Sequence, residues 1–349
     1  MIVLCPTVTR RLRPAALAWI LTPQGQPPHA KADAGIWRPR IGSGSLPGVR
    51  VLVTGAAGFV GQRLLAELEA QGHESFGIDV ECDIRDPRAV ARSVRGSAPQ
   101  ALIHLAGLAS VASSHAAAED TFAVNYVGAR SILEAVRQEA PQCRVLLVGS
   151  GEVYGNHAPG GEPFREEAAF TPGSPYANSK ACADRMGAAY RELGLDVVRV
   201  RPFNHIGPGQ HERFVVPSFA RQLAEIAGGR KEAILRTGNL DCVRDFLDVE
   251  DVLSAYLALL VPASGAGPFN IASGVGLRIG ALLDTLCAIA GLEPEIETDP
   301  TRFRPTDHSV GDASALRQAT GWRPQVDLNH TLERVYRHEL ERLQRSGTR

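Results

Sequence analysis

The chain has 349 residues, of which 44% are hydrophobic and 21% charged, a composition typical of a soluble globular protein with one large or two smaller domains. Acidic and basic residues nearly cancel to a net charge of -1, and neither sign forms a long block. This excludes a basic nucleic-acid-binding surface and an acidic tail, so a partner has to be inferred from a local site.

The first 47 residues differ from the rest of the chain. They contain seven prolines and show no sustained periodicity. Their one apolar run, residues 15–21, is too short to cross a bilayer, although the arginines before it give a weak signal-peptide pattern. We interpret residues 1–47 as a disordered extension or a misassigned start, and we expect no membrane partner.

A dinucleotide-binding pattern follows this segment. A short strand pattern at residues 49–53 leads into a glycine-rich loop and an amphipathic helix pattern at residues 62–72. Gly55 allows a tight turn, Gly58 lets the backbone approach a pyrophosphate, and Gly61 lets helix and strand pack closely. The phosphates would bind at the helix N-terminus, where free N–H groups favour anions. The predicted cofactor contacts in this loop are Gly55, Gly58, Phe59, Val60 and Gly61.

The next strand pattern, residues 74–78, ends at Asp79. A carboxylate there can accept both ribose hydroxyls of adenosine and would repel a 2′-phosphate, so of NAD and NADP the sequence favours NAD. An ordinary loop aspartate is the alternative. Asp83 and Ile84 stand where adenine contacts are expected. A further strand pattern at residues 101–107 ends in three more predicted cofactor contacts, Leu105, Ala106 and Gly107.

Strand and helix patterns alternate along this half of the chain. Residues 125–128 open another helix pattern, and residues 144–148 form another apolar strand. The alternation predicts an α/β fold, a Rossmann-type doubly wound parallel sheet with helices on both faces. We expect the NAD(P)-binding domain at residues 48–200 and a smaller, interleaved α/β substrate domain mainly at residues 201–345. His104, on an apolar strand, is expected to be a core residue rather than a ligand.

The strongest chemical signal is the pair Tyr176 and Lys180. The two stand four residues apart at the start of a helix pattern and therefore share one face. A tyrosine holds its proton to about pH 10, and a nearby ammonium would stabilise the phenolate and lower that pKa. Only three of the 37 Lys and Arg residues are lysines, so a lysine here indicates a need for a compact charge. Ser150, just after a strand, can hydrogen-bond a substrate oxygen.

Six residues in one order and spacing carry a resemblance to the extended short-chain dehydrogenase/reductase family, namely Gly55, Gly58, Gly61, Ser150, Tyr176 and Lys180. The resemblance covers about residues 48–345. It implies hydride transfer between C4 of nicotinamide and a carbon that bears a hydroxyl or a ketone. It also implies a nucleotide-activated sugar as substrate, a homodimer and a cytoplasmic location.

Three C-terminal segments resemble the members of this family that reduce GDP-4-keto-6-deoxy-D-mannose to GDP-D-rhamnose: residues 201–210, 238–246 and 304–312. This resemblance implies NAD(P)H-dependent reduction of the C4 ketone of a GDP-linked 4-keto-6-deoxyhexose. Tyr176 would donate a proton to the keto oxygen, the serine would polarise that oxygen, and Lys180 would hold the cofactor ribose.

Substrate contacts are predicted mainly from the same segments. Phe203 is expected to wall the nicotinamide. Residues 214–219 are expected to precede a helix, so that their backbone could reach the nucleotide base. Guanidinium groups pair with phosphates in two-pronged fashion, although any one arginine could be a solvated surface residue. The predicted substrate set is Ser150, Glu152, Asn204, Val216, Arg244, Arg302 and Arg304. No residues stand at metal-ligand spacing, and the six cysteines are expected to be buried thiols in a reducing compartment.

Glu152 keeps a second reaction open. In the related GDP-mannose 4,6-dehydratases, a glutamate at this position is the base that drives loss of water. The glycine loop lacks the Thr-Gly-Gln-Asp-Gly pattern of those enzymes, and residues 204–210 match the reductases instead. A 4-epimerase and a reductase that forms the talose-configured sugar share the same serine, tyrosine and lysine. A non-enzymatic cofactor sensor is disfavoured because Tyr176 and Lys180 are both retained.

Overall fold

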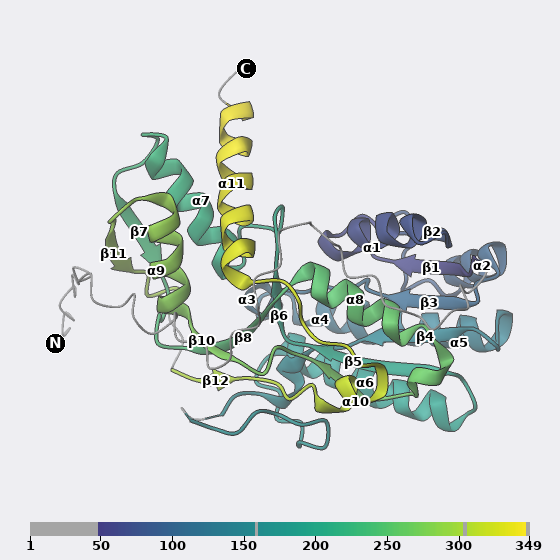
Figure 1. Ribbon diagram of the computed structural model, residues 1–349. Coiled ribbons are helices and arrows are strands. Elements are labelled where there is room, and N and C mark those ends of the chain that lie inside the picture. Colours follow the sequence, from purple (N-terminus) through teal and green to yellow (C-terminus); the bar gives the residue numbers. More distant parts are fainter. Residues whose placement is uncertain (1–47, 158–159, 303–305, 347–349) are drawn as a thin grey trace, which may run out of the picture.

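The computed structural model describes residues 48–157, 160–302 and 306–346 (Figure 1). The predicted N-terminal extension, residues 1–47, and Arg304 lie outside the described residues.

The larger sheet has six strands in the order β2–β1–β3–β4–β5–β9, and every pairing in it is parallel. The strands are β1 (Arg50–Thr54), β2 (Glu74–Ile78), β3 (Ala101–His104), β4 (Arg144–Val148), β5 (Val197–Pro202) and β9 (Phe269–Ile271). The chain reverses its direction across the sheet between β1 and β3, which is where open α/β sheets bind their ligands. The predicted Rossmann-type fold is confirmed.

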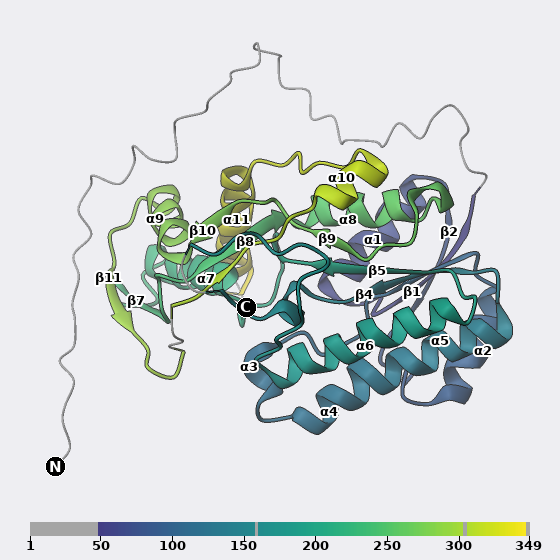
Figure 2. The same cartoon turned by 90° about the horizontal axis from the view of Figure 1, so that it is seen from below.

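Helices cover both faces of this sheet, so the unit has three layers (Figure 2). One face carries α2 (Pro87–Ser97), α3 (Val111–Ser114), α4 (Ala118–Phe122), α5 (Ala129–Glu139) and α6 (Pro175–Glu192). The other face carries α1 (Phe59–Ala70), α8 (Val249–Leu259) and α10 (Ser314–Thr320). Burial of the strand side chains between these layers makes the sheet a rigid support for the loops at its edge.

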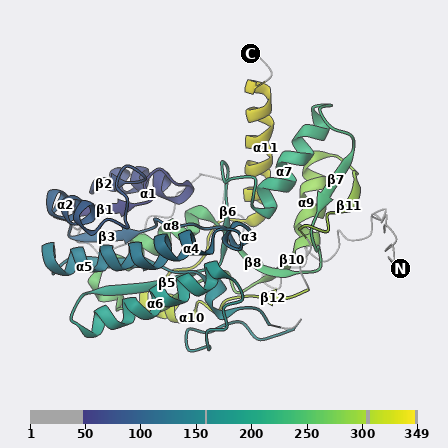
Figure 3. The same cartoon turned by 180° about the vertical axis from the view of Figure 1, so that it is seen from behind.

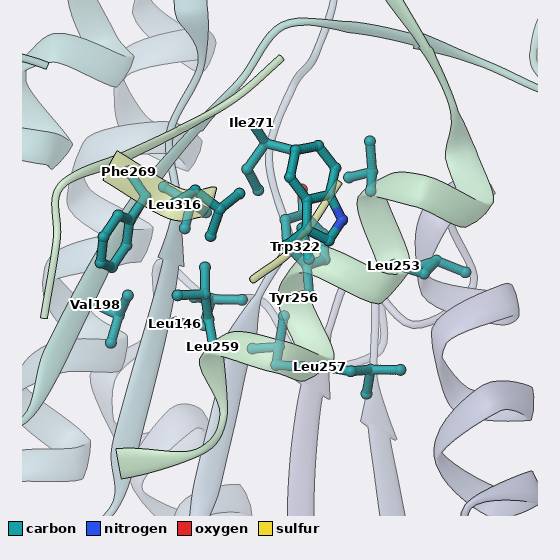
Figure 4. Packing of buried hydrophobic residues seen from close by; sticks show 14 of the residues in the cluster. Leu146, Val198, Leu253, Tyr256, Leu257, Leu259, Phe269, Ile271, Leu316 and Trp322 are labelled. Atoms are coloured by element: carbon teal, nitrogen blue, oxygen red, sulfur yellow. The ribbon is translucent and has the colours of Figure 1, made fainter. Parts of the chain in front are cut away.

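The C-terminal half contributes to this unit through β9, α8 and α10. Leu253, Tyr256, Leu257 and Leu259 of α8 belong to the same buried cluster as Leu146 and Val198 of the sheet (Figure 4). Trp322, which follows α10, is fully buried in the same cluster, and its Nε1 donates to Asp251 O at 3.0 Å and to Ser254 Oγ at 2.9 Å. The chain therefore returns to the dinucleotide fold after it has built a second unit.

The second unit lies beyond the carboxyl ends of the strands (Figures 1 and 3). Its sheets are β10–β8–β12 with β6 paired to β8, and the parallel pair β11–β7. The strands are β6 (Asn204–Ile206), β7 (Ile234–Thr237), β8 (Val243–Asp248), β10 (Gly276–Arg278), β11 (Glu295–Thr298) and β12 (His308–Ser309). The helices α7 (Val215–Ala227), α9 (Ile279–Ala290) and α11 (Leu328–Ser346) enclose a separate apolar core.

Three predicted helix boundaries were wrong. The first helix begins at Phe59 rather than residue 62, because Gly58 already serves as its N-cap. Residues 125–128 do not open a helix; they belong to η2 (Ala123–Gly128), a π-helical turn between α4 and α5. Residues 215–219 form the first turns of α7 and do not precede the helix. Pro217 fits there because a proline is tolerated in the first turn of a helix.

Candidate active site

The catalytic candidates lie at the carboxyl edge of the six-stranded sheet. Ser150 follows β4 and caps the short 3-10 helix η3 (Gly151–Tyr154), where its hydroxyl accepts from Glu152 N at 3.2 Å. Tyr176 and Lys180 lie in the first two turns of α6, which begins with Ser174 as N-cap and Pro175 at its first position. Both helix starts therefore follow from local sequence, and they bring Ser150 toward Tyr176.

The three side chains are buried together. Ser150, Tyr176 and Lys180 are 7%, 8% and 7% exposed. The Ser150 side chain hydrogen-bonds the Tyr176 hydroxyl, and Lys180 Nζ donates to Val148 O at 2.9 Å. Side chains locked in this way are preorganised, as a proton-transfer site requires.

The predicted lowering of the Tyr176 pKa was wrong for this structure. Burial raises the pKa of Tyr176 to about 12, and the Ser150 hydrogen bond only partly offsets this. The negative charge of Glu152 raises the pKa further. The lysine does not reverse the shift, because its Nζ is directed to the Val148 carbonyl. The phenol therefore keeps its proton at neutral pH, as a tyrosine of ordinary pKa also does.

Lys180 shows the opposite shift. Burial lowers its pKa to about 8, since an ammonium is poorly solvated in this position. His104 also lies nearby, and burial, followed by the charge of Lys180, lowers its pKa to about 3. Its Nδ1 is 2.8 Å from Thr54 Oγ1. His104 is thus a neutral core residue, as predicted.

The glycine loop has the shape of a phosphate cradle. Gly55 has a φ of +71°, and a Cβ there would lie 2.8 Å from Ala106 N; a Cβ on Gly61 would collide with Gly55 O. Within the described residues no side chain caps the N-terminus of α1, where Gly58, Phe59, Val60 and Gly61 stand. Gly58 N donates to Gly55 O at 3.1 Å, which leaves the N–H groups of Phe59, Val60 and Gly61 for an anion such as a dinucleotide pyrophosphate.

The acidic residue at the end of β2 is tied to this loop. Asp79 Oδ2 accepts from Ala57 N at 2.7 Å. Asp83 forms a two-pronged pair with Arg85, whose hydrogen bond lowers the pKa of the carboxyl. Ile84 is buried, and its side chain fills the space that a Cβ on Gly128 would occupy. Asp79 is thus the member of this group whose carboxylate lies directly against the glycine loop.

Asn125 is a site residue that the sequence reasoning missed. Its Oδ1 accepts from Leu108 N at 2.8 Å, and its Nδ2 donates to Leu108 O and to Ser179 Oγ. It therefore connects the loop after β3, which contains Leu105, Ala106 and Gly107, with the residue beside Lys180. A Cβ on Gly107 would lie 2.8 Å from Asn125 Oδ1 and 3.5 Å from Lys180 Nζ. Asn125 is buried in a π-helical turn, and neither its burial nor the turn can be read from the sequence.

The predicted phosphate-binding arginines differ in their partners. Arg244 on β8 forms a two-pronged pair with Asp307, with distances of 2.5 and 2.9 Å. Burial opposes the charge of Arg244, but the hydrogen bonds and charge of Asp307 outweigh it and raise the Arg244 pKa. Arg302 is 55% exposed and contacts Asp299 and Ser218. Asp307 was not foreseen, because its role depends on a partner 63 residues away.

The remaining substrate candidates differ in their burial and in the groups that they contact. Asn204 Nδ2 donates to Asp245 O at 3.1 Å, and the Val216 side chain is fully buried in α7. Phe203 is 5% exposed, and a Cβ on Gly151 would lie 3.0 Å from its ring. Glu152 lies close enough to influence the pKa values of both Tyr176 and Arg244. Glu152 therefore lies near both the proton donor and the candidate phosphate ligand.

Two negative findings apply to the part of the chain that the structure describes. It holds no group of three or more His, Cys, Asp or Glu residues able to bind a metal ion. None of its helices combines the length and apolar composition needed to cross a bilayer.

Known proteins share this fold and much of this sequence. The sequence profile of a family described as GDP-mannose 4,6 dehydratase matches residues 78–335. GDP-6-deoxy-D-mannose reductase of Pseudomonas aeruginosa is 36% identical over 82% of this chain and 95% of that protein. GDP-6-deoxy-D-talose 4-dehydrogenase of Aggregatibacter actinomycetemcomitans is 28% identical over 84% of this chain and 98% of that protein.

Solved structures agree with these sequence matches. The structure of RMD from Pseudomonas aeruginosa complexed with NADPH superposes with a TM-score of 0.78 at 35% identity, covering 84% of this chain and 99% of that chain. The Thermus thermophilus UDP-glucose 4-epimerase complex with NAD gives a TM-score of 0.75 at 31% identity, covering 83% and 98%.

Proposed function

Because the chain belongs to the family described as GDP-mannose 4,6 dehydratase, a branch of the extended short-chain dehydrogenases/reductases, we propose that it reduces the C4 ketone of a GDP-linked 4-keto-6-deoxyhexose. The substrate we favour is GDP-4-keto-6-deoxy-D-mannose, and the product is GDP-D-rhamnose. The relative named GDP-6-deoxy-D-mannose reductase, 36% identical over most of both chains, supports this choice.

One observation carries the proposal for the chemical step. Reduction of a ketone needs a proton for the oxygen as a hydride reaches the carbon. Tyr176 is buried at the site with its hydroxyl hydrogen-bonded to Ser150, and like any tyrosine it is protonated at neutral pH, so its hydroxyl can supply that proton. Ser150 hydrogen-bonds that hydroxyl and is positioned to polarise the same ketone oxygen.

The nicotinamide cofactor, when bound, supplies the hydride. Lys180 would hold its ribose, since the ammonium lies beside Gly107 at the end of the cofactor loop. The proposed contacts in the loops after β1, β2 and β3 are Gly55, Gly58, Phe59, Val60, Gly61, Asp79, Asp83, Ile84, Leu105, Ala106 and Gly107. The ring of Phe203 would form one wall of the nicotinamide site.

For the choice of cofactor we propose NAD. The Asp79 carboxylate is anchored to the glycine loop at Ala57 N, where a 2′-phosphate would meet its negative charge. The Pseudomonas aeruginosa relative was solved with NADPH, so NAD preference would distinguish this chain from it.

The substrate side is proposed from charge and position. Arg244, Arg302 and Arg304 would pair with the diphosphate. Asn204 and Glu152 would bind sugar hydroxyls, and the backbone at Val216 would reach the guanine base. We also propose a cytoplasmic homodimer without nucleic acid, membrane or metal partners, as expected from the family.

The position of Glu152 favours one rival function, that of a GDP-mannose 4,6-dehydratase. Glu152 lies near both Tyr176 and Arg244, where a carboxylate base could remove a proton from the sugar. That is the role of the corresponding glutamate in GDP-mannose 4,6-dehydratases. A dehydratase would regenerate its own NAD and need no added reductant.

The test supplies purified full-length protein with GDP-4-keto-6-deoxy-D-mannose and either NADH or NADPH. Oxidation of the reduced cofactor at 340 nm, with formation of a GDP-6-deoxyhexose, is the expected result. Oxidation of neither cofactor contradicts the reductase proposal. Conversion of GDP-D-mannose without added reductant establishes the dehydratase instead.

A further inference from the structure

A buried ion pair lies directly beneath the catalytic residues. Asp184 follows Tyr176 and Lys180 at intervals of four on α6, so the three side chains lie along one face of that helix. Its carboxylate, 1% exposed, accepts from Arg201 Nε at 2.8 Å and from Arg201 Nη2 at 3.0 Å. Arg199 Nη1 donates to the same carboxylate at 2.7 Å. The carboxylate thus holds the catalytic helix against β5.

Arg201 also contacts the segment that carries Ser150. Its Nη1 donates to the Tyr154 hydroxyl at 2.6 Å and to Glu166 O at 2.8 Å. Tyr154 ends the 3-10 turn that Ser150 caps, and its hydroxyl donates to Asn270 Oδ1 on β9 at 2.7 Å. One guanidinium therefore joins α6 to the turn after β4.

The pair lies close to the reacting groups without touching them. At a rise of about 1.5 Å per residue, Asp184 lies about 6 Å along the helix from Lys180 and about 12 Å from Tyr176. A Cβ on Gly149, the residue before Ser150, would be 3.8 Å from Asp184 Oδ2. A shift of this carboxylate therefore moves the helix that carries Tyr176 relative to the turn that carries Ser150.

A purely stabilising role explains this arrangement poorly. Buried ion pairs are often no more stabilising than apolar residues of the same volume, because both charges lose their water. Two-pronged bonds to a guanidinium do specify distance and angle. We propose that Asp184 and Arg201 are positioning residues, which set the placement of Tyr176 and Lys180 relative to Ser150 by joining α6 to the Ser150–Tyr154 turn.

The test, which rests on the proposed reductase function, compares two isosteric substitutions, Asp184→Asn and Asp196→Asn. Asp196 also accepts two bonds from one arginine, Arg144 Nη1, at 2.9 and 2.7 Å. It lies at the amino ends of β4 and β5, roughly 20 Å from Ser150 by strand rise. Its carboxylate is more exposed, so thermal unfolding of both variants is recorded and kcat is expressed per folded enzyme.

We expect Asp184→Asn to lower kcat by 10- to 100-fold, since displacements of about 1 Å cost rates on the order of 100-fold. KM for substrate and cofactor should change less than threefold, because neither touches Asp184. The solvent deuterium isotope effect on kcat should increase as proton transfer becomes slower. Asp196→Asn should leave all three quantities unchanged. Equal kcat and equal isotope effects in the two folded variants overturn the proposal.

If Asp184→Asn does not fold, the milder variant Tyr154→Phe tests the proposal. Tyr154→Phe keeps the ring but removes the hydroxyl that Arg201 and Asn270 hold. We expect a 3- to 10-fold lower kcat with a larger solvent isotope effect, and unchanged values for both overturn the proposal. Absence of turnover in the unmodified enzyme is a separate result, which contradicts the reductase function and not the positioning role.

Discussion

The proposed catalytic side of this protein, with Lys180, and the proposed substrate side, with Arg244, present their positive charges differently. Lys180 donates to a neutral carbonyl, and burial lowers its pKa to about 8. Arg244 is held by the carboxylate of Asp307, which keeps its pKa raised despite burial. The lysine is thus ready for a polar group of the cofactor, whereas a substrate phosphate has to share or replace the partner of the arginine.

The difference between the two sides has one consequence for the chemical step and another for substrate binding. A preformed catalytic side should govern the rate of the chemical step, because its groups need no rearrangement. A substrate side with internally paired charges should govern affinity, because binding exchanges one ion pair for another. Substitutions on the two sides test this division between rate and affinity, from the largest expected effect to the smallest.

Tyr176→Phe should reduce kcat by about 10²- to 10⁴-fold, the usual contribution of a positioned proton donor. Cofactor affinity should be unchanged, since the ring remains. Steady-state rates and NADH fluorescence titration measure the two quantities. Tyr190→Phe on the same helix is the matched control, because its hydroxyl contacts Glu134 far from the site. Near-normal turnover in Tyr176→Phe would remove the proposed mechanism.

Arg244→Gln should raise KM for the nucleotide sugar by about 10- to 100-fold, the loss expected for about 1.5–3 kcal/mol of charge-assisted hydrogen bonding. kcat should change little, because the diphosphate is remote from C4. Arg236→Gln is the control, since that arginine forms an exposed pair with Glu297. A fall in kcat at unchanged KM would contradict the division between the two sides.

Asp79→Ala should shift the ratio of Kd values for NADH and NADPH about tenfold toward NADPH, equivalent to about 1.4 kcal/mol of repulsion removed. Isothermal titration with both cofactors provides the ratio. A clear preference of the unmodified protein for NADPH would show that the carboxylate does not select the cofactor.

The smallest effect near neutral pH is the onset of a fall in kcat/KM with rising pH. The Lys180 pKa is lowered to about 8, so the ammonium is present below that pH and lost above it. kcat/KM should be halved near pH 8 and should then fall about tenfold per pH unit. Lys180→Arg should lower the rate but abolish this fall, because a guanidinium stays charged. A fall that persists in Lys180→Arg would assign the titration to another group.

The same shift affects stability. The folded pKa lies below the unfolded value of 10.5, so the unfolded chain binds more protons between about pH 8 and pH 10.5. The contribution of Lys180 to stability therefore increases as pH rises through this window.

Local sequence was sufficient where one short segment makes the site. The glycine loop, the turn at Ser150 and the i, i+4 pair on α6 each lie within a few residues, so spacing alone predicted them. The strands β2 and β4 were predicted at the bounds that the structure gives. Helix starts at residues 59 and 215 were missed, because caps without a polar side chain leave a weak signal.

The sequence by itself determined the dinucleotide fold and the serine, tyrosine and lysine, because backbone geometry within a segment depends on nearby residues. Only the tertiary structure decided that the pKa of Tyr176 is raised and not lowered, that Arg244 pairs with Asp307, and that Arg201 joins α6 to the Ser150 turn. The physical reason is that burial and charge partners come from segments far apart in the chain, and these set the pKa of a group and the direction of its side chain.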